Sequence, residues 1–340
     1  MLQHIACCWW VGVIGVIYTQ LCVCICSGFW NLEEVQVMGL TKYVILILAC
    51  YIGFQLIDPF DPGSIEGKRV VITGASTGIG EQIAYQYAKL GAKILITARR
   101  EGALQEVVAK CKELGAQEAL YLPLDMGKQE DTVRLIDEAK IRFGGLDHLI
   151  LNHITNNYMR LWTGDMDLLK QTMDINFHAY VSLATQSLPM LSESHGSIAV
   201  LSSFAGKVGV PFVACYSASK FALHGFFDAL RQELRLQNAT LSISTFVIGS
   251  IDTPNAKEFS KEVMDNNFFY TTASSTAYRI MTGTSNRERE VFYPWYQTRP
   301  MLLLRDVAPS LVELVMKLTV KQEIIEKVLK EPQFFSSFFL

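Results

Sequence analysis

Short apolar runs alternate with longer amphipathic patterns from Lys68 onward. The short runs are rich in β-branched residues, as expected of strands that are buried on both faces. We expect strands at Arg69–Thr73, Lys93–Thr97, Ala119–Pro123, Leu146–Leu151, Ser197–Ser202 and Leu241–Val247. Helical patterns such as Gly80–Leu90 and Leu104–Leu114 lie between them. Strands that alternate with helices of roughly 10 to 15 residues predict a parallel sheet with helices on both faces. We therefore expect a single doubly wound α/β domain over residues 67–293.

Two apolar runs precede this domain, and their lengths and flanking charges indicate a membrane segment. Ile5–Cys26 is uncharged and reaches the roughly 20 residues that span a bilayer, whereas Tyr43–Ile57 is shorter. Lys42 precedes the second run, and Asp58 and Asp61 follow it. This charge order favours a cytoplasmic start and translocation of the chain that follows. If both runs span, the first enters in the opposite orientation. We expect an endoplasmic reticulum membrane protein with a lumenal domain, or a secreted protein if the segment is cleaved.

Met38 offers a second possible start of the chain. Read from Met38, residues 38–66 form a short signal anchor or signal peptide followed by a linker. Residues 1–37 are then an apolar, cysteine-rich extension that an alternative start leaves out. The pattern changes again beyond the domain, because apolar clusters with interspersed charges predict an amphipathic helical tail over residues 294–340. This tail either packs against the domain or a dimer partner, or contacts a membrane.

Charge and cysteine content exclude several classes of function. Lys and Arg number 30 against 33 Asp and Glu, a formal net charge of −3, so the cationic excess that binds nucleic acid is missing. Of the 8 cysteines only Cys111 and Cys215 fall within the domain, which predicts no disulfide framework. No His/Cys cluster has zinc spacing, so we expect no metal. Asn238-Ala-Thr240 is a glycosylation pattern that agrees with a lumenal domain.

A glycine-rich turn directly follows the first predicted strand. It reads Thr73-Gly74-Ala75-Ser76-Thr77-Gly78-Ile79-Gly80 and leads into a helical pattern. Glycines let the backbone turn tightly and approach a phosphate, whose charge is met by free amides at the start of the helix. This strand-turn-helix setting predicts that the pyrophosphate of a dinucleotide binds here.

The end of the second predicted strand indicates which dinucleotide is used. An NAD-dependent protein usually places a carboxylate there for the ribose hydroxyls, but this chain has Arg99 and Arg100. A guanidinium holds a 2′-phosphate through forked, charge-assisted hydrogen bonds. We therefore expect NADP as the cofactor.

Tyr216 and Lys220 are one helical turn apart and so share a helix face. A nearby ammonium favours the phenolate, which lowers the tyrosine pKa from its usual value of about 10. Tyr216 is therefore a candidate general acid or base. Tyr85 and Lys89 have the same spacing, but only Tyr216 is preceded by serines at a strand end that can hydrogen-bond a substrate oxygen.

These motifs together resemble the short-chain dehydrogenase/reductase family, which has a Rossmann-like fold. The resemblance rests on the G-x-x-x-G-x-G spacing, on Tyr-Ser-Ala-Ser-Lys, on Ser203 thirteen residues before Tyr216, and on Asn176 in Met-Asp-Ile-Asn. It implies hydride transfer between the nicotinamide and a carbinol carbon, with Tyr216 moving the proton and Ser203 orienting the reacting oxygen. It implies that Lys220 binds the nicotinamide ribose and lowers the tyrosine pKa, and that Asn176 holds a water that links Lys220 to solvent.

Further cofactor contacts follow from the same resemblance. Asn152 and the residues after it stand where the family has an Asn-Ala-Gly segment, Asp125 matches an adenine-contacting aspartate, and Thr253 matches a residue that bonds the nicotinamide carboxamide. Besides Tyr216 and Lys220, the implied contacts at strand ends are Asp125, Met126, Asn152, His153, Ile154, Ile251 and Thr253.

Longer matches place the chain near one branch of this family. Leu149–Thr155, Ser202–Val208 and Tyr216–Leu223 are similar to the 11-beta-hydroxysteroid dehydrogenases. This implies a steroid substrate of the cortisol or cortisone type, a homodimer formed through the Tyr216 helix, and a membrane anchor. Besides Ser203 and Tyr216, the apolar candidates for substrate contact are Ile154, Phe204, Val210, Phe212 and Val213.

Two departures from that branch leave alternatives open. Thr77 replaces a lysine in the glycine turn, and Ser250 replaces an apolar pocket residue. The same chemistry on a retinoid, a fatty carbonyl or a xenobiotic carbonyl is one alternative. A membrane-anchored protein that binds NADP without catalysis is the other.

Overall fold

The structure is a computed structural model that describes residues 60–155, 159–260, 263 and 270–330. The two apolar N-terminal runs, Met38 and the last ten residues lie outside the described part, so the predictions made for them stay predictions. Within the described ranges, no helix combines the length and the apolar character that crossing a bilayer requires.

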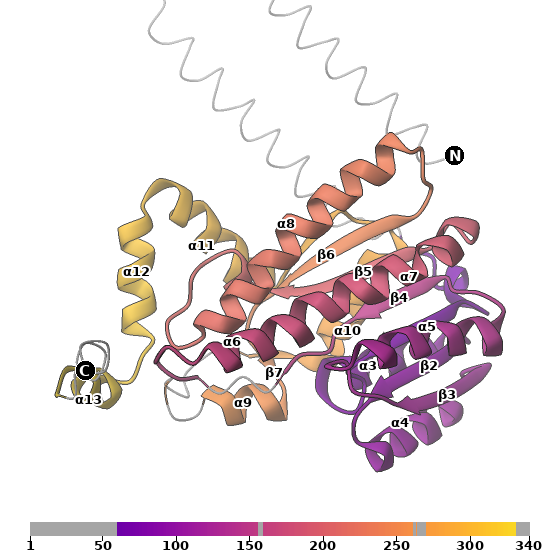
Figure 1. Ribbon diagram of the computed structural model, residues 1–340, viewed down its shortest axis with the longest axis horizontal. Coiled ribbons are helices and arrows are strands. Elements are labelled where there is room, and N and C mark those ends of the chain that lie inside the picture. The colour runs from indigo at the N-terminus through magenta and orange to yellow at the C-terminus, as the bar shows by residue number, and fades with distance from the viewer. Residues whose placement is uncertain (1–59, 156–158, 261–262, 264–269, 331–340) are drawn as a thin grey trace, which may run out of the picture. The chain divides into compact units, whose positions relative to one another are not determined.

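A single seven-stranded sheet organises the domain (Figure 1). Its strands are β1 (Arg69–Thr73), β2 (Lys93–Ala98), β3 (Glu118–Pro123), β4 (His148–Leu151), β5 (Ser197–Ser203), β6 (Ser242–Ile248) and β9 (Glu290–Tyr293). They lie in the order β3-β2-β1-β4-β5-β6-β9, and every pair is parallel. The doubly wound parallel sheet predicted from the sequence is confirmed. Because β4 follows β3 in the chain but lies beside β1, the winding reverses between β1 and β4.

Strand β9 is the one member of this sheet that the hydropathy pattern did not predict. It has four residues and pairs only with β6, through contacts such as Phe246 opposite Val291. A short edge strand needs little apolar sequence, since one side of it has no neighbour. The charged run Arg287–Glu290, which ends at the first residue of β9, also masks the strand signal.

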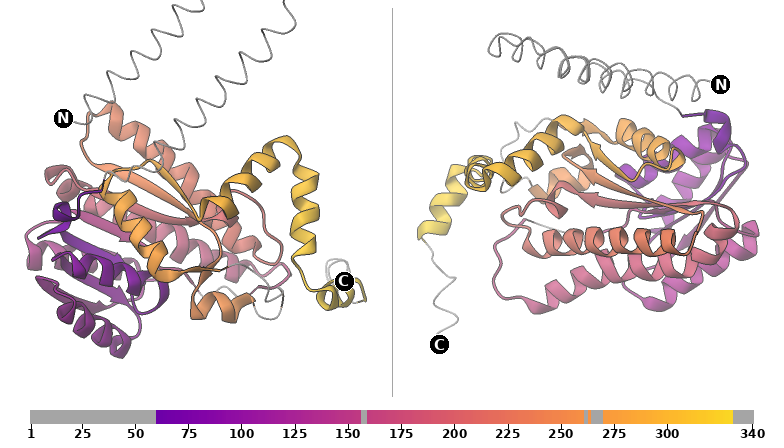
Figure 2. Two further views of the ribbon diagram at one scale, coloured as in Figure 1. Left: turned by 180° about the vertical axis from the view of Figure 1, so that it is seen from behind. Right: turned by 90° about the horizontal axis from the view of Figure 1, so that it is seen from above.

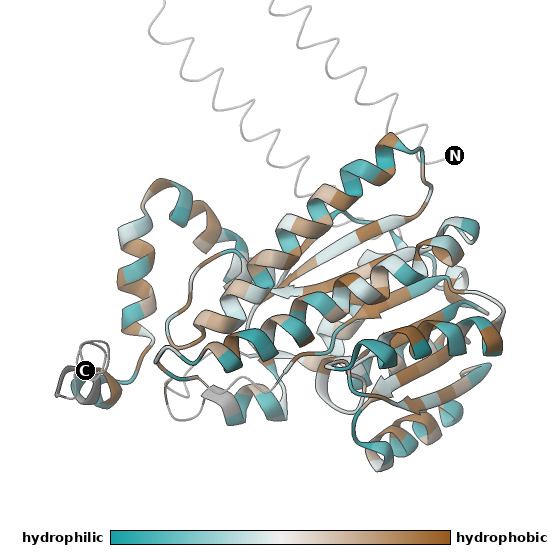
Figure 3. Ribbon diagram, in the orientation of Figure 1, coloured by the Kyte–Doolittle hydropathy of each residue, from teal (hydrophilic) through white to brown (hydrophobic). Residues whose placement is uncertain are grey.

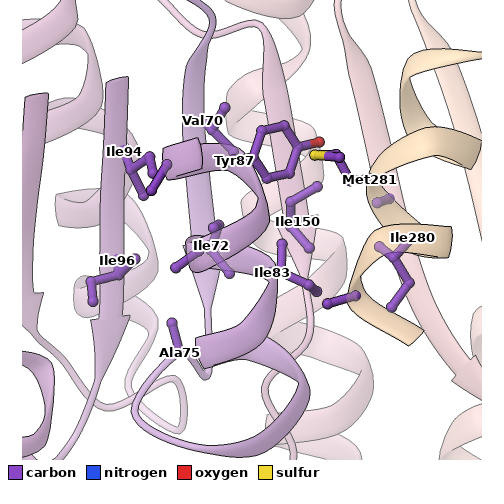
Figure 4. Packing of buried hydrophobic residues seen from close by; sticks show 14 of the residues in the cluster. Val70, Ile72, Ala75, Ile83, Tyr87, Ile94, Ile96, Ile150, Ile280 and Met281 are labelled. Carbon is purple, nitrogen blue, oxygen red and sulfur yellow. The ribbon is translucent and has the colours of Figure 1, made fainter. Parts of the chain in front are cut away.

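Helices cover both faces of the sheet, as Figure 2 shows from above. One face carries α3 (Gly78–Lys89), α4 (Glu101–Glu113) and α10 (Ala273–Ser285), and the other carries α5 (Gln129–Phe143), α7 (Ala179–Glu193) and α8 (Ala214–Leu236). Successive strand residues point to opposite faces, so Val70 and Ile72 join the first core while Val71 joins the second. Figure 4 shows part of the first core, in which Ile83 of α3 lies between Ile72 of β1 and Ile280 of α10.

Shorter elements surround the carboxyl ends of the strands. They are α6 (Met166–Met173), the π-helical turn η2 (Asp174–His178), η3 (Phe204–Gly206), β7 (Ile251–Asp252), α9 (Pro254–Ser260) and β8 (Thr271–Thr272), which pairs with β7. The short helix η1 (Pro62–Ile65) instead precedes the amino end of β1. The predicted helical tail is confirmed as α11 (Trp295–Val307), α12 (Pro309–Leu318) and α13 (Gln322–Lys330). Leu302 and Val312 of this tail pack against Val208. Figure 3 shows further apolar residues along α11 and α12, and Leu303 and Val307 among them are exposed.

An ion pair joins the amino ends of β1 and β4. The guanidinium of Arg69 donates to both carboxylate oxygens of Asp147 at 2.8 and 3.1 Å, and the Arg69 backbone N–H donates to the same carboxylate at 2.8 Å. Burial raises the pKa of Asp147, but the hydrogen bonds from Arg69 outweigh that effect and hold the pKa below its ordinary value.

We expect Asp147→Asn to lower the free energy of unfolding by about 2 kcal/mol at pH 7, because the Arg69 charge keeps only a neutral partner. The native pKa is lowered, so this stabilisation is complete above the unfolded pKa of about 3.9 and is lost as the pH falls through the native value. Urea unfolding from pH 3 to 7 measures the difference. Glu113→Gln, in the exposed Lys110–Glu113 pair, is the control and should cost no more than about 0.5 kcal/mol. Equal losses in both variants would contradict the account.

Candidate functional site

A cleft of about 860 Å³ lies at the carboxyl ends of the strands. Its walls come from the turn between β1 and α3, from the ends of β2 to β6, and from α8. Every predicted dinucleotide contact except Gly80 lines this cleft: Gly74, Ser76, Thr77, Gly78, Ile79, Arg99, Arg100, Asp125, Met126, Asn152, His153, Ile154, Tyr216, Lys220, Ile251 and Thr253. The cleft adjoins the point where the winding reverses, which is where open parallel sheets bind their ligands.

The glycine turn is shaped by its lack of side chains. Gly74 and Gly78 have φ angles of +66° and +65°, a region that favours glycine. A Cβ on Gly74 would lie 2.7 Å from the His153 Cα, and one on Gly80 would lie 2.3 Å from the Gly74 carbonyl oxygen. Thr77 precedes α3 without capping it through its side chain. The first amides of α3 therefore face the cleft without a side-chain cap, and this arrangement fits a diphosphate.

Gly80 has a packing role, which explains why it does not line the cleft. The close approach of its Cα to the Gly74 carbonyl lets α3 pack directly against the turn. Ala75, inside the same turn, is fully buried in the first core (Figure 4). One side of the turn is thus held by the hydrophobic core, and its other side borders the cleft.

Two exposed arginines border the cleft where β2 ends. The Arg100 guanidinium donates to the Ser76 hydroxyl oxygen at 3.3 Å, which links the end of β2 to the glycine turn. Neither Arg99 nor Arg100 forms a salt bridge with any residue in the described part of the chain. Both cations can therefore meet an anionic group beside the turn.

Asn152 holds the glycine turn in place. Its side-chain amide donates to the carbonyl oxygens of Thr73 and Gly74 at 3.1 and 3.0 Å. His153, the next residue, is buried, and its Nε2–H donates to the Ile175 carbonyl oxygen at 3.0 Å. Because burial lowers the pKa of His153 to about 3, the ring is neutral, and its Nδ1 accepts from the Thr73 hydroxyl at 2.9 Å.

Ser203, Tyr216 and Lys220 lie close together in the lining of the cleft. Ser203 ends β5, and its Oγ accepts from the Ala205 backbone N–H at 3.1 Å. Its hydroxyl hydrogen-bonds the Tyr216 hydroxyl. Lys220 lies one turn further along α8, with its Nζ 5.7 Å from the centre of the Tyr216 ring. The arrangement places a proton donor, an orienting hydroxyl and an amine around one point.

The predicted effect of Lys220 on Tyr216 is not seen in the protein alone. Burial raises the pKa of Tyr216, and the hydrogen bond from Ser203 opposes this rise only in part. Burial also lowers the pKa of Lys220 to about 7, so at neutral pH part of its positive charge is lost. The sequence spacing showed that the two side chains are neighbours but not that Lys220 is buried.

Asn176 lies behind the cleft wall rather than in it. It is fully buried in the π-helical turn η2, a feature that is often found at functional sites. Its Oδ1 accepts from the Thr155 N–H at 2.8 Å, and its Nδ2 donates to the Ser219 hydroxyl at 3.2 Å. The side chain thus ties the end of β4 to α8. Its predicted role in holding a water stays a prediction.

Some of the predicted substrate contacts line the cleft, and others do not. Ile154 and Val213 line the cleft. Phe204 and Val210 do not line it. Phe204, in η3, packs against Val208 and the helical tail. Phe212 lines a separate hollow of about 560 Å³ beside α12.

Met159, Ile175 and Asn255 are among the residues that line the cleft without having been singled out from the sequence. Their segments carry no strand or glycine pattern, and only their proximity in the chain to Ile154, Asn176 and Thr253 gave a signal. The second Tyr-Lys pair is not among the residues that line this cleft, since Tyr85 packs against the first core.

The sequence matches a family model described as short chain dehydrogenase over residues 68–264. The chain is 43% identical over 269 residues to the hydroxysteroid 11-beta-dehydrogenase 1-like protein of Xenopus tropicalis, covering 79% of this chain and 93% of that one. It is 45% identical over 249 residues to the protein of the same name from Gallus gallus, covering 73% and 86%.

Solved structures share the fold. An alcohol dehydrogenase from Thermococcus sibiricus, complexed with 5-hydroxy-NADP, superposes with a TM-score of 0.58 at 23% identity, covering 67% of this chain and 96% of that one. A short chain dehydrogenase/reductase from Burkholderia phymatum, in complex with NAD, gives 0.65 at 20% identity, covering 73% and 96%. Together with the glycine turn and the parallel sheet, these matches show that the chain belongs to the short-chain dehydrogenase family of oxidoreductases.

Proposed function

We propose that this chain is an NADP-dependent oxidoreductase that interconverts a hydroxyl and a keto group on a steroid. The observation that carries the proposal is the meeting of Ser203, Tyr216 and Lys220 in a cleft that the glycine turn also lines. Tyr216 can thus exchange a proton with a substrate in the cleft, while the glycine turn in the same cleft binds a diphosphate. The names of the relatives at 43% and 45% identity support the steroid.

A nicotinamide dinucleotide, when bound, supplies or takes up the hydride. The chain's own residues manage the oxygen of the substrate. Ser203 donates a hydrogen bond to that oxygen, and Tyr216 gives it a proton in reduction or removes one in oxidation. Lys220, through its protonated form, stabilises the phenolate that remains. Asn176 links η2 to α8, and this keeps α8, which carries Tyr216 and Lys220, in a fixed position.

The arginines at the end of β2 support NADP rather than NAD. Arg99 and Arg100 are exposed and line the cleft, and Arg100 contacts the Ser76 hydroxyl. A 2′-phosphate placed here would receive charge-assisted hydrogen bonds from both guanidinium groups.

The location and assembly are proposed on the sequence. We propose that the N-terminal apolar segment anchors the chain in the endoplasmic reticulum membrane, with the domain in the lumen and a second copy as partner. Asn238, in the glycosylation pattern, is exposed. Loss of an endoglycosidase-sensitive gel shift in Asn238→Gln would support the lumenal side, and a glycan-free wild-type protein would count against it.

We expect Tyr216→Phe to lower the rate of reduction of an 11-keto steroid by at least about 100-fold, because the proton donor at the substrate oxygen is removed. NADPH affinity should change by less than about threefold. Turnover with a panel of 11-keto steroids, retinoids and fatty aldehydes, together with fluorescence titration of NADPH, measures both. Tyr85→Phe is the control, since it has the same spacing to a lysine and should be unchanged. Equal turnover in wild type and Tyr216→Phe would refute the role of Tyr216.

We expect Arg99→Ala to weaken NADPH binding by about 10- to 100-fold and NADH binding by less than about twofold. The reason is that the lost hydrogen bonds to the 2′-phosphate are charge-assisted. Calorimetric titration with both nucleotides measures the difference, with Arg235→Ala on the exposed end of α8 as the control. A parallel loss for NADH would show that Arg99 does not select the phosphate.

We expect NADPH affinity to fall as the pH rises from 6 to 8. Lys220 is protonated below its pKa of about 7 and neutral above it, so its positive charge is available to the anionic nucleotide only on the acid side. Lys220→Met should remove this component, while ionisation of the 2′-phosphate contributes equally to both proteins. The same pH dependence in both proteins would contradict the assignment.

A further inference from the structure

Lys220 is a buried cation whose stabilisation is unusual. Its side chain is almost fully buried, and the salt bridges of the described residues give it no carboxylate partner. Its Nζ donates one hydrogen bond, to the Leu201 carbonyl oxygen at 2.7 Å. A buried ammonium without an opposite charge is costly, so other groups have to contribute.

Two aromatic rings lie within range of a cation–π interaction with this ammonium. The Nζ is 5.1 Å from the centre of the Tyr180 ring and 5.7 Å from the centre of the Tyr216 ring, and both distances are below the roughly 6 Å at which the interaction is significant. Tyr216 has chemistry of its own to perform. Tyr180 is fully buried on α7 and has no other part in the proposed reaction.

Tyr180 is held in a single position. Its hydroxyl donates to the His153 backbone carbonyl oxygen at 2.8 Å, and its ring packs on the His153 ring with centres 4.5 Å apart. His153 is itself fixed between the Thr73 hydroxyl and the Ile175 carbonyl. The ring of Tyr180 is therefore anchored to both the glycine turn and η2.

The ionisable groups that face Lys220 leave it as the one cation of this cluster. His153 and His224 both have their pKa lowered to about 3, first by burial, so both are neutral. Tyr180 and Tyr216 have raised pKa values, again because of burial, so both are phenols. The aromatic faces and the Leu201 carbonyl are thus what the ammonium meets.

We propose that Tyr180 is a positioning residue for Lys220: its buried ring, anchored by His153, is the face on which the ammonium rests, and this keeps Lys220 protonated beside Tyr216. The inference deepens the proposed function, because a protonated Lys220 is what stabilises the phenolate. Tyr180 acts through Lys220 and does not touch the reacting atoms.

The test measures the pKa of Lys220 directly, without cofactor or substrate. Full-length protein labelled with ¹³C-lysine gives a Cε resonance for Lys220, assigned by its absence in Lys220→Arg, and the shift is followed from pH 5 to 10. We expect Tyr180→Phe, which keeps the ring, to leave the midpoint within about 0.2 unit of wild type. We expect Tyr180→Met, which removes the aromatic face, to lower the midpoint by at least about half a unit.

A second variant and a control separate this effect from general damage to the core. Tyr180 replaced by 4-cyanophenylalanine keeps the aromatic ring but withdraws electron density from it, and it should also lower the midpoint even if Tyr180→Met folds poorly. Tyr87→Met is the matched control, because Tyr87 is equally buried and also bonds a histidine, His148, at 2.8 Å, but lies in the other core. It should leave the midpoint unchanged.

Activity gives the second readout. The rate of 11-keto steroid reduction in Tyr180→Met should fall about threefold or more at pH 7.5 and recover toward wild type at lower pH, and Tyr180→Phe should not show this pH-dependent loss. An unchanged midpoint in both the Met and the cyanophenylalanine variants would overturn the inference, as would an equal shift in Tyr87→Met. Absence of NADPH binding in wild type would instead overturn the proposed function, since the resonance of Lys220 is measured without nucleotide.

Discussion

The site depends on one constraint, that all strands of the central sheet run in the same direction. Their carboxyl ends then form a single edge, and the reversal of winding between β1 and β4 opens that edge. The glycine turn after β1, the arginines after β2 and the serine at the end of β5 come from distant parts of the chain. They line one cleft because, in a parallel sheet, the segments that follow the strands all lie at the same edge.

Burial governs the chemistry within this edge. It raises the pKa of the Tyr216 phenol and lowers that of the Lys220 ammonium, so each group is pushed toward its neutral form. The contacts that oppose this push are the Ser203 hydrogen bond to the phenol, the Leu201 carbonyl and the aromatic faces around the ammonium. A site of this kind responds strongly to any added charge, such as that of an oxidised nicotinamide.

The sequence predicted the sheet and the site residues well where the signal was local. Six strands lie within two residues of their expected bounds, because strands buried on both faces read as continuous apolar runs. The glycine turn and the Tyr216–Lys220 pair are short motifs, and the structure brings them into one cleft. What could not be predicted depends on distant contacts. Strand β9 exists only through its pairing with β6, Phe204 turns toward helices a hundred residues later, and Tyr180 reaches Lys220 only in the folded protein.

The most direct test of the proposed function is the transfer of a labelled hydride. Purified protein is incubated with NADPH deuterated at C4 of the nicotinamide, on the transferred face, and with an 11-keto steroid, and the product is examined by mass spectrometry and NMR. The account predicts one deuterium on the carbinol carbon of the product, and none in a reaction with Tyr216→Phe over the same time. A reduced product without deuterium on the carbinol carbon, or no reduction of the 11-keto steroid, would contradict it.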